Sequence, residues 1–145
     1  NGLEIGTADG YSSLWIARAM RKTKGKLTTI EIDEKTWKDA IENFKKAGLQ
    51  DIIEAKCADA FDAIPSLEEN FDFVFLDAEK QDYAKLFLLI FPELLPGGVF
   101  MAHNTVDSKK ELAEFIALIK SYPGLDTEFY EKGQGFSISF RKKTN

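Results

Sequence analysis

The sequence has little cysteine, no long apolar run and no extended basic segment. Its one cysteine, Cys57, excludes an internal disulfide and is typical of the reducing cytoplasm. No stretch approaches the roughly 20 apolar residues that cross a bilayer, and no signal-peptide pattern is present, so we expect no membrane partner. Lysine and arginine stand three in a row only at 141–143, and the net charge is −5, which disfavours nucleic acid as a partner.

The 145 residues are sufficient for one domain with a sizeable core, because 44% of them are hydrophobic and 12 are phenylalanine. Cys57 ends an apolar run, so we expect a buried structural thiol there rather than a nucleophile. The chain begins within its first predicted strand. We therefore expect residues 1–145 to form a single domain whose N-terminal part is missing.

Strand-like and helix-like segments alternate along the chain without repeats. Apolar and β-branched runs predict strands at 3–5, Lys26–Ile32, Ile52–Cys57, Phe71–Leu76, Val99–Ala102, Thr127–Tyr130 and Phe136–Phe140. Apolar residues at helical spacing predict helices over Ser12–Met20, from Asp33 to Gly48, over Phe61–Leu67, around 83–90, and from a capping box at Ser108–Glu111 to Pro123. This order predicts an α/β fold, with a doubly wound, Rossmann-like, mostly parallel sheet and a terminal antiparallel hairpin.

The stretch Asn1 to Ser13, NGLEIGTADGYSS, carries the strongest functional signal. A strand that breaks at Gly6 and Gly10 and continues as a helix presents backbone N–H groups and the positive end of the helix dipole to a ligand. The spacing differs from the Gly-x-Gly-x-x-Gly pattern, which counts against an NAD-dependent oxidoreductase. Glu4 either orients this loop or binds the amine of an amino-acid moiety. The alternative is a plain glycine turn with a solvated Glu4.

Several polar residues lie at or just after the carboxyl ends of predicted strands. In a doubly wound sheet the ligand lies beyond the carboxyl ends of the strands, and this rule gathers the glycine turn, Glu31, Asp59, Asp77 and His103-Asn104 into one crevice. Glu31 ends its strand where an acidic side chain can accept the hydroxyls of a ribose. A surface glutamate would have the same appearance in the sequence.

Six motifs run in order along the chain: LEIGTADGYSSLW, TIEID, DAFDAIPSL, FDFVFLDAEKQDY, LLPGGVFMAHNT and GQGFSISF. In this order and spacing they resemble the class I S-adenosylmethionine-dependent O-methyltransferases of the catechol and caffeoyl-CoA type, from Leu3 to Phe140. The chain is similar to the catalytic core of that family without the helices that usually precede it. The resemblance implies a cytoplasmic enzyme that transfers a methyl group from S-adenosylmethionine to a hydroxyl of a small aromatic or catechol-like acceptor. A homodimer is one assembly that it leaves open.

The resemblance also implies which residues form the site. Those that would bind the cofactor are Glu4, Gly6, Ala8, Gly10, Tyr11, Ser12, Glu31, Ile32, Asp59, Ala60 and Asp77. The glycine turn would line the methionine end, with Glu4 shaping the loop. Glu31 would take the ribose hydroxyls, Ile32 would pack near the adenine, and Asp59 with Ala60 would border its edge. Lys80 matches the general base of family members, and Asp77 matches a residue that binds metal beside the cofactor.

His103 departs from the family pattern, which typically has Asp-Asn where this chain has His103-Asn104. Aspartate suits magnesium or calcium, whereas imidazole favours zinc, manganese, iron or nickel. Three interpretations stay open. A softer divalent metal binds Asp77, His103 and Asn104; or His103 replaces the metal as a base or orienting group, since its ordinary pKa is near neutral; or the metal site is lost, leaving a cofactor-binding module without turnover. The catalytic candidates are Lys80 and His103.

The segment after Asn104 departs from the family as well. It enters the next predicted helix almost at once, which leaves no room there for a long acceptor-binding insertion. The identity of the methyl acceptor therefore does not follow from the sequence.

Overall fold

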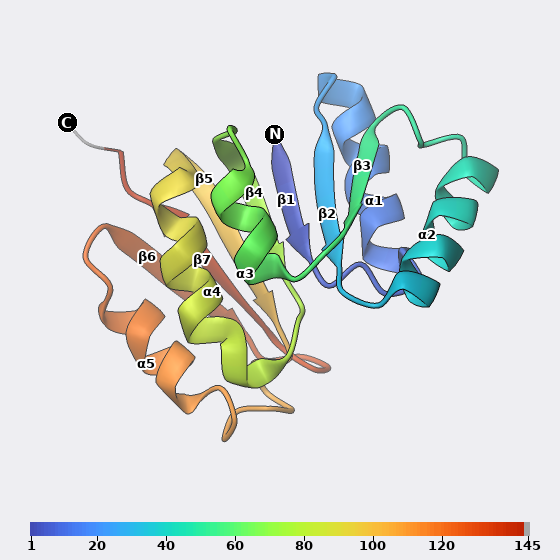
Figure 1. Ribbon diagram of the computed structural model, residues 1–145. Coiled ribbons are helices and arrows are strands. Elements are labelled where there is room, and N and C mark those ends of the chain that lie inside the picture. The colour runs from blue at the N-terminus through green and yellow to red at the C-terminus, as the bar shows by residue number, and fades with distance from the viewer. Residues whose placement is uncertain (144–145) are drawn as a thin grey trace. The chain divides into compact units, whose positions relative to one another are not determined.

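A computed structural model describes residues 1–143 of the chain. The chain divides into two compact units, Asn1–Glu68 and Glu69–Asn145 (Figure 1). Strand and helix alternate through both units, as the sequence predicts. No helix among the described residues is both long and apolar enough to cross a membrane.

The first unit is a parallel sheet with the strand order β3-β2-β1. Its elements are β1 (Gly2–Ile5), α1 (Tyr11–Met20), β2 (Leu27–Glu31), α2 (Glu34–Lys46), β3 (Ile53–Cys57) and α3 (Ala60–Ala63). Ala17 of α1 and Ala40 and Phe44 of α2 pack with Leu27 and Ile53 in one buried cluster. Asp33 caps α2 as expected, since its carboxylate accepts a hydrogen bond from the Thr36 N–H at 2.7 Å.

Cys57 corrects one expectation, because its thiol is exposed rather than buried. Ile53 and Ala55 lie on the same face of β3 as Cys57, and exposure rises along this face from the buried Ile53 to the last strand residue. The core cluster reaches Ile53 and Ala55 but not Cys57. The apolar run in the sequence did not show that the core packing ends before Cys57.

The second unit contains the strands in the order β4-β5-β7-β6. Its elements are β4 (Phe71–Leu76), α4 (Tyr83–Ile90), β5 (Leu94–His103), α5 (Ala113–Ser121), β6 (Leu125–Tyr130) and β7 (Phe136–Arg141). Strand β4 is parallel to β5, and β7 is antiparallel to both β5 and β6, which confirms the terminal hairpin. Helices α4 and α5 lie on one face of these strands (Figure 1). Phe87 is the centre of the aromatic core between these helices and the strands, and its ring packs edge-to-face against Phe100 and Tyr122.

Two predicted boundaries in this unit are wrong. Strand β5 begins at Leu94 rather than Val99, since a register shift opposite Phe71 and Phe73 accommodates the Pro96-Gly97-Gly98 turn within the strand. Helix α5 begins at Ala113, and its N-cap residue Leu112 makes no side-chain hydrogen bond, so the capping box does not form. The buried side chain of Leu112 fixes the start of the helix by packing instead.

Gly10 and Gly48 provide a test of how the first unit is packed. Both have a positive φ, but a Cβ at Gly10 would lie 2.4 Å from the Phe44 ring, whereas a Cβ at Gly48 meets nothing within 4 Å. We expect Gly48→Ala to lower the free energy of unfolding by roughly 1 kcal/mol through backbone strain alone. Gly10→Ala should cost about 1–3 kcal/mol more, because the Phe44 ring must move. Urea unfolding measures both, and equal losses would contradict this account.

Candidate functional site

Glu4 is a fully buried carboxylate in the middle of β1. It accepts hydrogen bonds from the hydroxyls of Ser13, in α1, and Thr29, in β2, the latter at 2.7 Å. The Thr29 hydroxyl in turn lies 2.6 Å from that of Thr7 in the glycine turn. Glu4 is therefore not a solvated residue, and its contacts fit the role of orienting the loop. Sequence reasoning missed Thr7, Ser13 and Thr29, since polar residues in a turn, helix or strand look like ordinary surface positions.

The glycine turn and Glu31 are in direct contact. Gly6, Ala8 and Gly10 all have a positive φ, which is uncommon for an alanine. The Ala8 N–H donates to Glu31 Oε2 at 2.8 Å, and the Asp33 N–H donates to Oε1 at 3.0 Å. Each oxygen of Glu31 thus supports the backbone of a loop and keeps further lone pairs for another donor.

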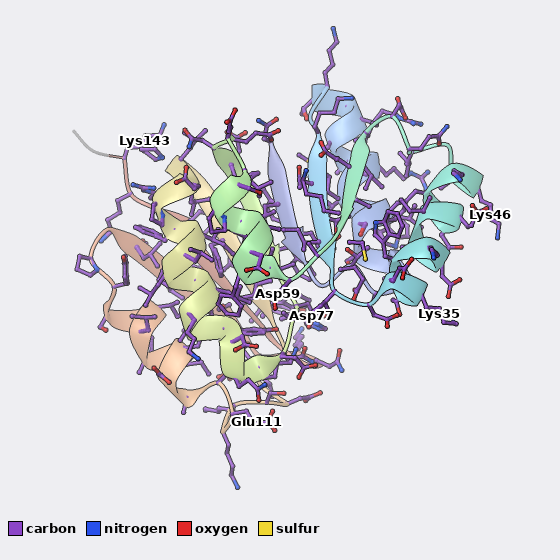
Figure 2. The ribbon with its side chains drawn as sticks, viewed as in Figure 1. Lys35, Lys46, Asp59, Asp77, Glu111 and Lys143 are labelled. Carbon is purple, nitrogen blue, oxygen red and sulfur yellow. The ribbon has the colours of Figure 1, made fainter. Side chains whose placement is uncertain are left out.

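The remaining candidates of the first unit border this loop. Gly10, the N-cap residue of α1, offers no side-chain cap, and the first N–H of the helix, that of Tyr11, donates to Asp9 Oδ1 at 3.3 Å. Tyr11 and Ile32 expose 71% and 69% of their surface, unusual for large apolar side chains. The Ala58 N–H donates to the Glu31 carbonyl at 2.9 Å, which brings Asp59 beside the end of β2. Asp59 (labelled in Figure 2) caps α3 by accepting from the Phe61 N–H. The turn, Glu31 and Asp59 therefore lie together.

Asp77, which follows β4, is the centre of a second cluster (labelled in Figure 2). Lys80 Nζ donates to its Oδ1 at 2.9 Å, and His103 Nδ1 lies 2.9 Å from its Oδ2. Burial acts to raise the pKa of the Asp77 carboxyl, but the hydrogen bonds and charges of Lys80 and His103 outweigh it and hold that pKa below its ordinary value. The structure thus joins Asp77, Lys80 and His103.

Lys80 makes three hydrogen bonds, which use the three donors of an ammonium group. Besides Asp77 Oδ1, its Nζ donates to the Ala78 carbonyl and to the Tyr83 hydroxyl, both at 3.0 Å. Burial and the neighbouring Asp77 charge raise the pKa of the Tyr83 phenol well above its ordinary value, so this group stays protonated. Sequence reasoning had placed Tyr83 only among the apolar residues of its helix.

His103 is held from its other side by the hairpin. Its ring stacks on the Phe136 ring with centroids 4.7 Å apart, and the two residues are paired partners in β5 and β7. Beyond His103, the Val106 N–H donates to the Gln134 carbonyl at 3.0 Å. Gly135 permits this close approach, because its φ is positive and a Cβ there would lie 2.8 Å from the Val106 nitrogen.

The sequence pattern of a family described as "Methyltransferase domain" matches residues 3–105 of the chain. The chain belongs to this family. The fold agrees, since the chain superposes on a solved O-methyltransferase from Bacillus cereus in complex with SAH with a TM-score of 0.88. The match has 30% identity and covers 98% of this chain and 74% of that one. The class I methyltransferase fold expected from the sequence is thereby confirmed.

Curated relatives carry the names that the motifs predict. This methyltransferase domain is 37% identical over 118 residues to the catechol O-methyltransferase of Niastella koreensis, covering 79% of this chain and 53% of the relative. It is 29% identical over 128 residues to caffeoyl-CoA O-methyltransferase 2 of Petunia hybrida, covering 84% and 52%. The resemblance to this type of enzyme is confirmed. The chain spans about half the length of these curated relatives.

The donor set at Asp77 does not fit a divalent cation. Both carboxylate oxygens already have partners, and one of these is the Lys80 ammonium. A cation at Oδ1 would have to displace this positive charge. Within residues 1–143, no three His, Cys, Asp or Glu side chains lie where they could hold a metal ion. The interpretation in which Asp77, His103 and Asn104 bind a softer metal therefore lacks support from the geometry.

The lowered pKa of Asp77 predicts a pH dependence of stability. A carboxyl whose pKa is lower in the folded state stabilises the protein above the unfolded pKa of about 3.9, and this contribution is lost as the pH falls through the folded value. Asp77→Asn should therefore be less stable than the wild type at pH 7, with the difference shrinking below about pH 4. Asp126→Asn, which alters an exposed carboxylate of β6, is the control. A difference between wild type and Asp77→Asn that does not vary with pH in urea unfolding would contradict the prediction.

Proposed function

We propose that this methyltransferase domain binds S-adenosylmethionine and transfers its methyl group to a hydroxyl of a small aromatic acceptor, with His103 as the general base. The observation that carries the proposal is the contact of His103 Nδ1 with Asp77 at 2.9 Å, in a chain that belongs to a methyltransferase family. The aromatic acceptor rests on the relatives named for catechol and caffeoyl-CoA. A cytoplasmic location, which the single cysteine favours, belongs to the same proposal.

The residues around the glycine turn fit S-adenosylmethionine. Gly10 offers α1 no side-chain cap, so the first turn of the helix after Tyr11, whose own N–H donates to Asp9, can receive the carboxylate of the methionine end at Ser12. The free lone pairs of Glu31 suit the ribose hydroxyls, and the exposed Ile32 offers an apolar surface to the adenine. Asp59 and Ala60, beside the end of β2, border the adenine edge in this assignment. Glu4 acts indirectly, because it is buried behind the loop that it orients.

The second cluster suits removal of the acceptor proton. When bound, S-adenosylmethionine supplies an electrophilic methyl group for an in-line displacement, and the acceptor oxygen must lose its proton. With the His103 proton on Nδ1 facing Asp77, the lone pair lies on Nε2, which can accept that proton. Asp77 then orients the ring and stabilises the imidazolium that forms.

Lys80 has a different role in this scheme from the one that the resemblance implies. A general base needs a lone pair, and all three donors of the Lys80 ammonium are engaged by oxygen atoms. We therefore assign Lys80 to holding the Asp77 carboxylate and His103 to the proton transfer.

Calorimetric titration with S-adenosylhomocysteine tests the cofactor class. The titration is run on the chain with and without manganese, and NAD is titrated as a control. Binding of S-adenosylhomocysteine but not NAD, unchanged by manganese, is the expected result. Binding of NAD alone would refute the proposal, and a manganese effect would refute its metal-free site. Binding without any methylation of a catechol acceptor would indicate a cofactor-binding module.

Glu31→Ala tests the ribose assignment. Losing a charged hydrogen-bond acceptor should weaken S-adenosylmethionine binding by about 1–3 kcal/mol. The matched control is Glu34→Ala, which removes an exposed carboxylate three residues further on, in the first turn of α2, and should leave affinity unchanged. Thermal unfolding of both variants reports any loosening of the Ala8 loop separately. Unchanged affinity in Glu31→Ala would remove the assignment.

His103→Ala tests the base. Loss of a positioned general base should lower kcat by about 10²–10⁴-fold, with the KM for S-adenosylmethionine little changed. Added imidazole should restore part of the rate, since it can enter the space that the side chain leaves. Methylated product is measured by mass spectrometry with catechol as acceptor. Wild-type rates in His103→Ala, together with complete loss in Lys80→Met, would assign the base to Lys80 instead.

A further inference from the structure

The Tyr83 hydroxyl lies where the Lys80 ammonium and the ends of β4 and β5 meet in the second unit, and the proposed function gives this hydroxyl no role. Tyr83 opens α4 and is fully buried. Its hydroxyl oxygen lies 3.0 Å from Lys80 Nζ, 3.3 Å from the Leu76 carbonyl and 3.4 Å from the His103 carbonyl. These two carbonyls belong to the last residues of β4 and β5. Asp77 Oδ1, at 3.5 Å, completes the surroundings of the hydroxyl.

We propose that Tyr83 is a positioning residue: its hydroxyl holds the Lys80 ammonium against Asp77, and through Asp77 it fixes the orientation of His103. The consequence for catalysis rests on the proposed function, whereas the holding of Lys80 does not. Tyr83 itself touches no reacting atom in this scheme.

Packing alone does not account for a tyrosine at this position. The Tyr83 ring packs edge-to-face on Phe115 with centroids 5.3 Å apart, a contact that a phenylalanine would also make. Burying a hydroxyl costs free energy unless it forms hydrogen bonds. Here the hydroxyl accepts from Lys80 and has three oxygen atoms within reach of its single proton. Its partners thus come from the two strand ends and from the segment that bears Lys80.

Lys80 needs such an anchor because its side chain is long and flexible. Fixing a lysine side chain costs rotamer entropy, which each added contact must offset. Among residues 1–143 the Tyr83 hydroxyl is one of three acceptors for the Lys80 ammonium, and the Tyr83 ring adds a fourth contact, with Lys80 Nζ 5.0 Å from its centroid. Removing the hydroxyl leaves one N–H without its partner and frees the ammonium to leave Asp77.

Tyr83→Phe, compared with Tyr122→Phe, tests the proposal. Tyr122 belongs to the same aromatic core, where its ring contacts Phe87 and Phe91, so the control removes the same atom from the same layer. The first measurement is the ¹H–¹⁵N cross peak of the Lys80 ammonium, assigned with Lys80→Met. A held ammonium exchanges its protons slowly, whereas the exposed Lys35 and Lys46 on α2 (labelled in Figure 2) provide the fast-exchange reference.

We expect the Lys80 cross peak in the wild type and in Tyr122→Phe, and its loss in Tyr83→Phe. We also expect kcat with catechol to fall by about 10- to 100-fold in Tyr83→Phe with an unchanged KM for S-adenosylmethionine, because the site is misplaced rather than emptied. Thermal unfolding confirms that each variant is folded.

A Lys80 cross peak that persists in Tyr83→Phe would overturn the proposal whatever the activity. So would a wild-type Lys80 that exchanges as fast as Lys35 and Lys46, a result that needs no variant to fold. Loss of the cross peak with unchanged kcat would overturn the catalytic consequence and keep the holding of Lys80. A wild type that binds no S-adenosylhomocysteine would reject the proposed function, while the cross peak would still decide the role of Tyr83.

Discussion

The carboxylate of Asp77 is the contact on which the second unit's site depends. One oxygen binds the Lys80 ammonium, three residues further along the chain, and the other faces His103 at the end of the neighbouring strand. The ion pair with Lys80 and the contact with His103 lower the pKa of this carboxyl despite its partial burial. The Asp77 carboxylate can orient the His103 imidazole only if the carboxylate itself is held in place. Lys80 and the two strand ends hold it.

In the first unit, carboxylates also hold a functional segment in place, here the glycine turn. Glu4 is buried beneath the glycine turn, and the hydroxyls of Ser13 and Thr29 bind it there. Glu31 supports the same turn from outside by accepting the Ala8 N–H. Within this loop the positive φ of Ala8 is strained, because alanine has a Cβ, and these two carboxylates supply contacts that stabilise it. Each unit thus uses the carboxylate of a residue in or just after a strand to hold a neighbouring segment in place.

A histidine after β5 changes the chemistry that this position can support. The Asp77–Lys80–His103 arrangement already places a positive charge on the carboxylate where a divalent cation would bind, and it presents an imidazole that this carboxylate orients. In the proposed scheme a divalent cation is replaced by two groups. The fixed charge of Lys80 and the proton-accepting nitrogen of His103 together lower the barrier to proton loss from the acceptor. Phe136 keeps the ring in place by stacking on it.

The sequence by itself determined the order of strands and helices, the terminal hairpin and the family, because apolar periodicity and short motifs are local properties of the chain. It also pointed to Glu31, Asp77 and His103, since these residues lie at or just after the ends of strands. Only the tertiary structure decided that Glu4 is buried, that Cys57 is exposed, and that Tyr83 reaches Lys80 and two strand ends. The burial of Glu4 and the approach of Tyr83 to the His103 carbonyl depend on contacts between segments distant in sequence, and residue spacing carries no record of them.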